Sequence, residues 1–143
     1  MVGSACAPEC SKLIGWVRGT LKQSREMRRY HHIGIPTAES RPGERHLKHL
    51  KTFIVGHENS EFGVEWMRFE PDATIPDLIR HVPHVAFEVS DLDAELAGRE
   101  VLIAPNSPSD GVRVAFIVEN GAPIELLEFT NPNHPARRRY EGE

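Results

Sequence analysis

The sequence has 143 residues, of which 39% are hydrophobic and 27% are charged, and its formal net charge is −4. These values are typical of one globular domain with a substantial core. The acidic balance gives no reason to expect nucleic acid as a partner, because nucleic acid attracts basic surfaces. No stretch approaches the ~20 apolar residues of a membrane span, and two cysteines confined to the first ten residues favour a reducing, cytoplasmic setting.

The first element in chain order is an amphipathic helix over residues 11–27. Ser11 is a suitable N-cap, and four apolar side chains fall near one helical face: Leu13, Ile14, Val17 and Leu21. We therefore expect residues 1–28 to form a helical N-terminal extension. We expect it to dock on an uncovered sheet face of this chain or of a partner copy.

Strand patterns dominate the rest of the chain, and the main domain is expected over residues 29–135. The predicted strands cover residues 31–37, 51–57, 62–70, 84–90, 100–105, 112–119 and 123–129. Asn120-Gly121 predicts a hairpin between the last two strands, and residues 90–98 predict a short helix. The proline-rich residues 71–83 predict a linker, and residues 136–143 predict a charged, solvated tail.

The chain contains one pattern twice. In each copy a strand begins with a histidine, and a later strand has a glutamate as its second residue. The first copy, about residues 29–72, contains "HHIGI" and "VEW"; the second, about residues 83–130, contains "HVAFEV" and "IEL". The first copy is shorter where the second holds its helix, and Pro42-Gly43 disfavours an uninterrupted helix there. The sequence therefore predicts two similar modules in one α+β domain.

Strand alternation places the four repeated polar residues on one side of the predicted strands. They are His32, Glu65, His84 and Glu125, and each points away from a strongly apolar face. Two modules related by a pseudo-twofold axis would bring them together. Two imidazoles and two carboxylates suit one divalent ion, with Zn or Ni favoured and Mn, Co or Fe as alternatives.

Other polar residues compete with this assignment. His31 competes with His32, but alignment of the repeats selects His32, and alternation sends Glu128 to the face opposite Glu125. His46 and His49 lie among charges, and His81 lies in the linker. The simplest alternative is that the four repeated residues form local hydrogen bonds or contact a ligand directly, without a metal.

The doubled motifs resemble those of the vicinal oxygen chelate superfamily, which includes glyoxalase I, bleomycin resistance proteins and extradiol dioxygenases. The resemblance covers roughly residues 30–130. It implies two βαβββ modules, here with a shortened first helix, that form a U-shaped mixed sheet around the metal. It also implies a homodimer.

The resemblance to the glyoxalase-like members implies an enzyme. We expect a metal-dependent lyase or isomerase that acts on a small carbonyl, 2-oxo or hydroxy substrate through a metal-stabilised enediolate. His32, Glu65, His84 and Glu125 would hold the metal, with Glu125 as the preferred base and Glu65 as the second choice. The rival expectation is a non-catalytic small-molecule binding protein of the bleomycin-resistance type.

Overall fold

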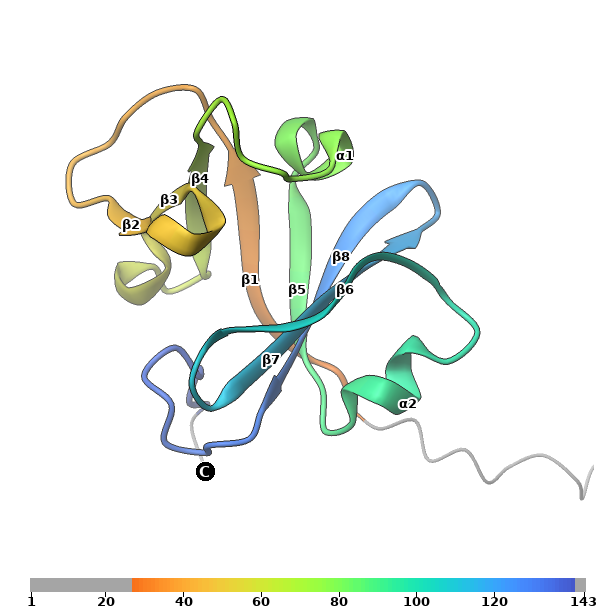
Figure 1. Cartoon of the computed structure of the whole chain (residues 1–143). Coiled ribbons are helices and arrows are strands. Elements are labelled where there is room, and N and C mark those ends of the chain that lie inside the picture. Colours follow the sequence, from red (N-terminus) through yellow and green to blue (C-terminus); the bar gives the residue numbers. More distant parts are fainter. Residues whose placement is uncertain (1–26, 141–143) are drawn as a thin grey trace, which may run out of the picture.

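The computed structural model describes residues 27–140 as one curled, mixed sheet of eight strands with two short helices (Figure 1). The fold is thus of the mixed α+β class and dominated by its sheet. The strands are β1 (Arg29–Pro36), β2 (Arg45–Leu47), β3 (Thr52–Val55), β4 (Val64–Phe69), β5 (His84–Glu88), β6 (Glu100–Ser109), β7 (Val112–Glu119) and β8 (Ala122–Phe129). The helices are α1 (Asp77–His81) and α2 (Leu92–Leu96), and two 3-10 turns are η1 (Lys48–Leu50) and η2 (His57–Asn59).

The strand order is β2-β3-β4-β1-β5-β8-β7-β6. Strand β1 pairs parallel with β4, and β5 pairs parallel with β8, while β1 and β5 pair antiparallel at the centre. The two halves therefore have equivalent strand orders when each is counted from its own edge towards the centre: β2-β3-β4-β1 in one half and β6-β7-β8-β5 in the other. The four repeated histidines and glutamates lie on the four central strands, β4, β1, β5 and β8.

Local sequence signals explain several boundaries. Asn120 (φ 49°) and Gly121 (φ 77°) form the tight turn between β7 and β8, as predicted, because both adopt the left-handed conformation that this turn requires. Asp91 caps α2, where its carboxylate accepts a hydrogen bond from the Ala94 N–H at 2.9 Å. Strand β6 extends beyond its predicted end through Pro105 and Pro108, which an edge strand tolerates.

The first half of the sheet lacks the shortened helix that was expected between its first two strands. Residues 37–44 form a loop instead, with Gly43 at φ 82°, and the chain continues into the short edge strand β2. Within this loop Arg41 stacks over the Trp66 ring at 3.7 Å, and Glu44 accepts two hydrogen bonds from Arg68. The loop thus covers part of the sheet face that a helix would otherwise cover.

Buried apolar residues pack on both faces of the sheet. One cluster lies on the inner, concave side and contains Ile79, Ala86, Val112, Val114, Phe116 and Leu127. The other lies under α2 and contains Val89, Leu92, Ala115, Ile117 and Leu126. Alternation along β7 and β8 produces both clusters, because successive side chains point to opposite faces.

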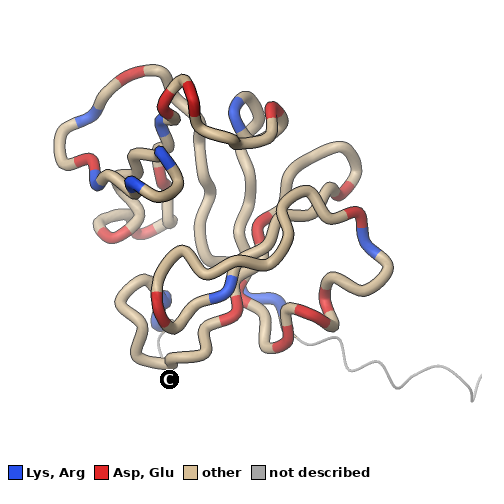
Figure 2. Tube along the Cα trace, in the orientation of Figure 1, with Lys and Arg blue, Asp and Glu red and all other residues tan. Residues whose placement is uncertain are grey.

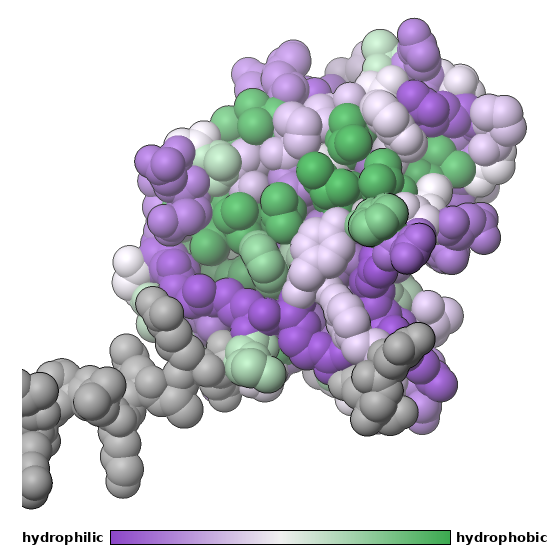
Figure 3. Space-filling view, turned by 180° about the vertical axis from the view of Figure 1, so that it is seen from behind, coloured by the Kyte–Doolittle hydropathy of each residue, from purple (hydrophilic) through white to green (hydrophobic). Residues whose placement is uncertain are grey.

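The outer face of β1 carries Ile33 and Ile35, which are half-buried. Figure 3 shows apolar side chains gathered on the back of the molecule, whereas acidic and basic residues are interspersed along the loops and edges in Figure 2. The helix predicted over residues 11–27 falls almost wholly outside the described residues. None of the described helices is long and apolar enough to cross a membrane.

Candidate metal centre

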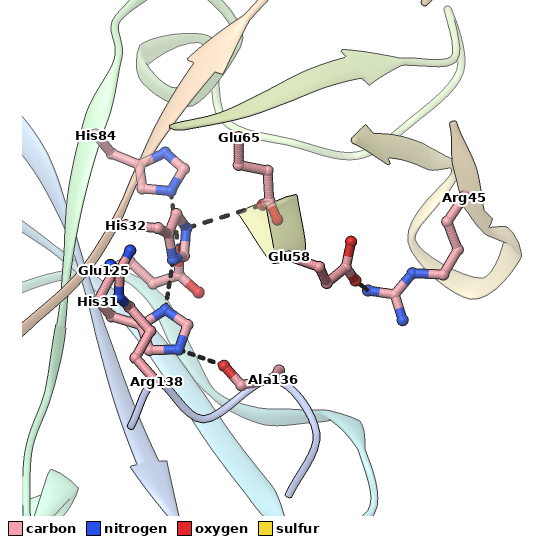
Figure 4. A network of polar contacts seen from close by, with 9 residues as sticks. All are labelled: His31, His32, Arg45, Glu58, Glu65, His84, Glu125, Ala136 and Arg138. Atoms are coloured by element: carbon pink, nitrogen blue, oxygen red, sulfur yellow. Dashed lines mark hydrogen bonds and ion pairs between the residues drawn. The ribbon is translucent and has the colours of Figure 1, made fainter. Parts of the chain in front are cut away.

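The four repeated polar residues come together on the concave face of the central strands (Figure 4). His32 lies on β1, Glu65 on β4, His84 on β5 and Glu125 on β8. The strand pairings explain this placement: Glu65 pairs with Gly34 of β1, and Glu125 pairs with Ala86 of β5. Each half of the sheet therefore contributes one imidazole and one carboxylate.

Glu125 is the centre of the group. Its Oε2 atom lies 2.9 Å from Nε2 of His84 and 3.1 Å from Nε2 of His32. Glu65 lies further out, with its Oε1 atom 3.8 Å from Nε2 of His32. One ligand atom from each of His32, His84 and Glu125 lies within 4.8 Å of the others, a spacing that one metal ion could bridge.

Gly34 makes room for the imidazole of His84. The two residues are paired across the β1–β5 ladder, and His84 is almost fully buried, with 1% of its surface exposed. A Cβ atom at position 34 would lie under 3.0 Å from three ring atoms of His84. The ring therefore occupies space that only glycine at position 34 leaves open.

A β-bulge brings a fifth residue, His31, to the site. The β1–β5 register shifts by one residue between Tyr30 and His32, so His31 is the extra residue on β1. As a result both His31 and His32 are buried and line the same cavity. Alignment of the repeats selected His32 over His31, and the bulge explains why His31 nevertheless lies at the site beside it.

His31 determines which nitrogen of His32 carries a proton. Nε2 of His31 lies 2.7 Å from the Ala136 carbonyl, which can only accept, so this nitrogen donates. Burial first, and then the charge interactions with His32 and His57, lower the pKa of His31 to about 4, so its ring is neutral near pH 7. Nδ1 of His31 is therefore an acceptor.

The acceptor on His31 lies 2.8 Å from Nδ1 of His32, which must then be the donor. When His32 is neutral, its Nε2 atom consequently carries a lone pair that faces Glu125 and Glu65. A metal-ligating histidine typically has this arrangement, with the remote nitrogen donating to an outer partner. The hydrogen-bonded chain Ala136–His31–His32 thus orients the imidazole for a cation.

The C-terminal segment holds His31 in place. Arg138 donates to the carbonyls of His31 and Glu61, at 3.2 and 2.5 Å, and Arg137 pairs with Glu88 at 2.8 Å. The prediction that the arginines of this segment are free in solvent is therefore wrong for Arg137 and Arg138. Their partners lie 49 or more residues away in the chain, a distance that local sequence patterns do not reveal.

The carboxylates have opposite electrostatic environments. Burial raises the pKa of Glu65, and the nearby positive charge of His32 offsets this only in part. Burial would also raise the pKa of Glu125, but His32 and His84 outweigh it and lower that pKa below its usual range. Burial lowers the pKa of His32, and Glu125 and Glu65 reverse this effect, so that the net pKa is raised.

The donor set fits a divalent cation. His32 Nε2 is buried without an aligned hydrogen bond, although two carboxylates lie 3.1 and 3.8 Å away. Such an arrangement of two imidazoles and two carboxylates is typical of a site for Zn or its neighbours in the first transition series. A second group of His31, His32 and His57 also has its ligand atoms within 4.8 Å, but His31 is already bonded at both ring nitrogens.

Of the competing histidines, His46 and His81 are held by other groups, whereas His49 belongs to the lining of the cavity described below. His46 stacks on Phe53 and lies 2.6 Å from Glu70. His81 contacts the Asp77 carbonyl at 2.9 Å, within α1. Glu128 pairs with Arg113 at 2.8 Å on the outer face, as alternation predicted.

The site forms part of the wall of a cavity of about 960 Å³ that lies inside the curl of the sheet. His32, Glu65 and Glu125 belong to its lining, together with His57 of η2. Most of the remaining wall is apolar and comes from β3, β4, β6, β7 and α1. The size is at the upper end of the range for small-molecule sites, about 300–1,000 Å³.

The fold of this chain has been seen before. It is similar to the crystal structure of the hypothetical protein BH1468 from Bacillus halodurans C-125, with a TM-score of 0.55 and 18% sequence identity over 80% of this chain and 98% of that one. No family model and no curated protein matches the sequence. The similarity establishes a shared fold for the curled sheet and carries no statement about activity.

Proposed function

We propose that the protein is a metal-dependent, glyoxalase-like lyase or isomerase that acts on a small carbonyl, 2-oxo or hydroxy substrate. The observation that carries this proposal is the convergence of four residues from four strands: His32, Glu65 and Glu125 line the cavity, and His84 contacts Glu125 from behind them. The repeated strand order supports the resemblance to vicinal oxygen chelate proteins, whose two modules enclose a metal in a U-shaped sheet.

The four residues would hold the ion, and the bulged His31 would orient His32 through its hydrogen bond. When bound, a divalent ion supplies a Lewis acid that polarises a carbonyl group and stabilises the enediolate formed from it. The apolar part of the cavity wall lowers the local dielectric and so strengthens electrostatic interactions at the reacting carbon.

The contacts favour Glu65 over Glu125 as the base that removes the proton. Glu125 is held by both imidazoles, at 2.9 and 3.1 Å, whereas Glu65 has only the longer contact with His32. A carboxylate in a buried setting with a raised pKa is better suited to accept and return a proton near neutral pH. This reverses the order in which the sequence alone ranked the two glutamates.

The proposal is tested by metal analysis combined with a reaction readout that does not require the substrate to be known. Purified full-length protein is expected to bind one divalent ion per chain. With that ion bound, it should exchange the C–H proton of some 2-hydroxy or 2-oxo carbonyl compound for deuterium, followed by NMR across a panel of such compounds. Glu65→Gln should abolish exchange and retain most of the metal, whereas Glu125→Gln should lose the metal.

Glu128→Gln is the matched control, because Glu128 lies on the same strand as Glu125 but on the opposite face. It should leave both metal binding and exchange unchanged. A protein that binds no metal at equilibrium yet binds a small molecule in the cavity would overturn the enzyme proposal in favour of a non-catalytic binding protein.

A further inference from the structure

Apolar side chains line the cavity on both sides of the His/Glu group. On one side are Ile54, Met67 and Phe69 of β3 and β4, and on the other are Ile103, Val114 and Phe116 of β6 and β7. The polar group lies between these two sets of side chains because it belongs to the central strands β4, β1, β5 and β8. A ligand with its oxygens in the middle and apolar groups on both flanks matches this distribution.

The charges that line the cavity disfavour an anionic ligand. The described lining has two cationic side chains, Arg45 and Lys51, and four carboxylates, so its formal charge is −2 with the histidines counted as neutral. Moreover, both cations are already paired: Arg45 lies 3.5 Å from Glu58, and Lys51 is bonded to Asp72. Both of these acids also line the cavity.

A divalent ion at the proposed centre would bring the formal charge of this lining to zero. No cation of the described lining would then be left without an acidic partner to bind a phosphate or a carboxylate. Burying an unpaired anion among apolar side chains is costly, whereas an uncharged ligand avoids this cost and gains about 25 cal/mol per Å² of apolar area removed from water.

We propose that the cavity takes an uncharged carbonyl compound with bulky apolar substituents on both sides of its oxygens, a class that excludes phosphate esters and carboxylates. The part of this inference that places the ligand oxygens at the metal rests on the proposed function. The preference for apolar and uncharged ligands rests on the residues of the cavity wall alone. Two matched comparisons of probes separate the two selectivities.

The first comparison tests charge with methyl phenylglyoxylate and the phenylglyoxylate anion, which differ by one ester group. The second tests apolar bulk with benzil and diacetyl, which share a dicarbonyl but carry two phenyl or two methyl groups. Binding to the full-length protein is measured by titration calorimetry, with and without Zn²⁺. We expect the ester and benzil to bind at least tenfold more tightly than their counterparts.

A pair of neighbouring substitutions on β3 locates the binding. Ile54 faces the cavity and Val55 faces away, and both are half-buried. Ile54→Trp fills the cavity and should weaken benzil binding at least tenfold, whereas Val55→Trp should leave it unchanged. Thermal unfolding and Zn²⁺ affinity of both variants show that the fold and the metal centre are retained.

The outcomes distinguish this inference from the proposed function. One outcome is a protein that takes up no metal and yet binds benzil in a way that Ile54→Trp weakens. That result would support the ligand class and overturn the proposal of a metal-dependent enzyme. Tight metal binding with equal or stronger affinity for phenylglyoxylate than for its ester would overturn the ligand class. Equal loss of benzil binding in the Ile54 and Val55 variants would also overturn it.

Discussion

Gly34 and His84 face each other across the β1–β5 ladder, and the imidazole of His84 occupies the space that any side chain at position 34 would need. The absence of a Cβ atom is therefore a requirement of the site rather than of the backbone, because Gly34 is not among the glycines with positive φ. This relationship leads to a direct test of the geometry.

We predict that Gly34→Ala displaces the His84 ring and weakens divalent-metal binding about 10- to 100-fold, the range seen when the support of a ligand is lost. Metal affinity is measured by competition with a chromophoric chelator. The double variant Gly34→Ala/His84→Asn should bind metal no more weakly than His84→Asn alone, because the two changes act on one ring. Additive losses would show that Gly34 acts elsewhere.

We predict that His31→Phe changes the tautomer of His32, because it removes the acceptor that fixes a proton on Nδ1 of His32. Long-range proton–nitrogen NMR spectra of the metal-free protein, recorded above the raised pKa of His32, should show a protonated Nδ1 in the wild type and a tautomer mixture in the variant. Metal affinity should fall about 10- to 100-fold. His57→Phe, which alters a ring stacked on His31 at 4.7 Å, is the control and should keep the tautomer.

We predict that the stability of the metal-free protein falls as the pH drops from 6.5 towards 4, in part because of His57. Burial, and then the charges of His32 and Arg138, lower the pKa of His57 to about 4 in the fold, while the unfolded chain titrates at about 6.5. Between these values the unfolded state binds more protons, so acid favours it. In urea unfolding, His57→Phe should show a shallower loss over this window, and parallel curves for the two proteins would contradict the prediction.

We predict that deletion of residues 136–143 lowers both the melting temperature and the metal affinity. It removes the Ala136 carbonyl from His31, the Arg137–Glu88 pair and the Arg138 hydrogen bonds. Each such bond is worth about 0.5–1.5 kcal/mol or more, so differential scanning calorimetry should show a loss of about 5 °C or more. Deletion of residues 141–143 alone is the control and should change neither quantity.

The sequence was sufficient to predict the sheet-dominated α+β class and most strand positions, because alternation and turn residues encode these locally. The turn at Asn120-Gly121 and the short helix within residues 90–98 are examples. The four repeated polar residues were also predicted to lie together, and in the structure Glu125 contacts both His84 and His32 while Glu65 lies 3.8 Å from His32. Their ligation of a metal stays a prediction.

What escaped prediction depends on shifts of one residue or on contacts between distant segments. The bulge at His31 brings this side chain to the same cavity as His32, and the amino-acid composition of the strand does not indicate that a bulge forms there. The short edge strand β2 has little apolar pattern of its own and forms because β3 offers it a partner. The role of Ala136 and Arg138 depends on chain positions more than 70 residues away.

The antiparallel seam between β1 and β5 joins the two halves of the sheet, and each half supplies one imidazole and one carboxylate to the candidate centre. An ion bound there would have ligands from both halves and would act as a cross-link between β1 and β5. Separating the two halves would require metal–ligand bonds to break. Ligand binding stabilises the joined state by an amount that grows with the logarithm of free metal over the dissociation constant. Amide hydrogen exchange along β1 and β5 would therefore slow as metal is added. The exchange rates of these two strands would thus measure the fraction of protein that has metal bound.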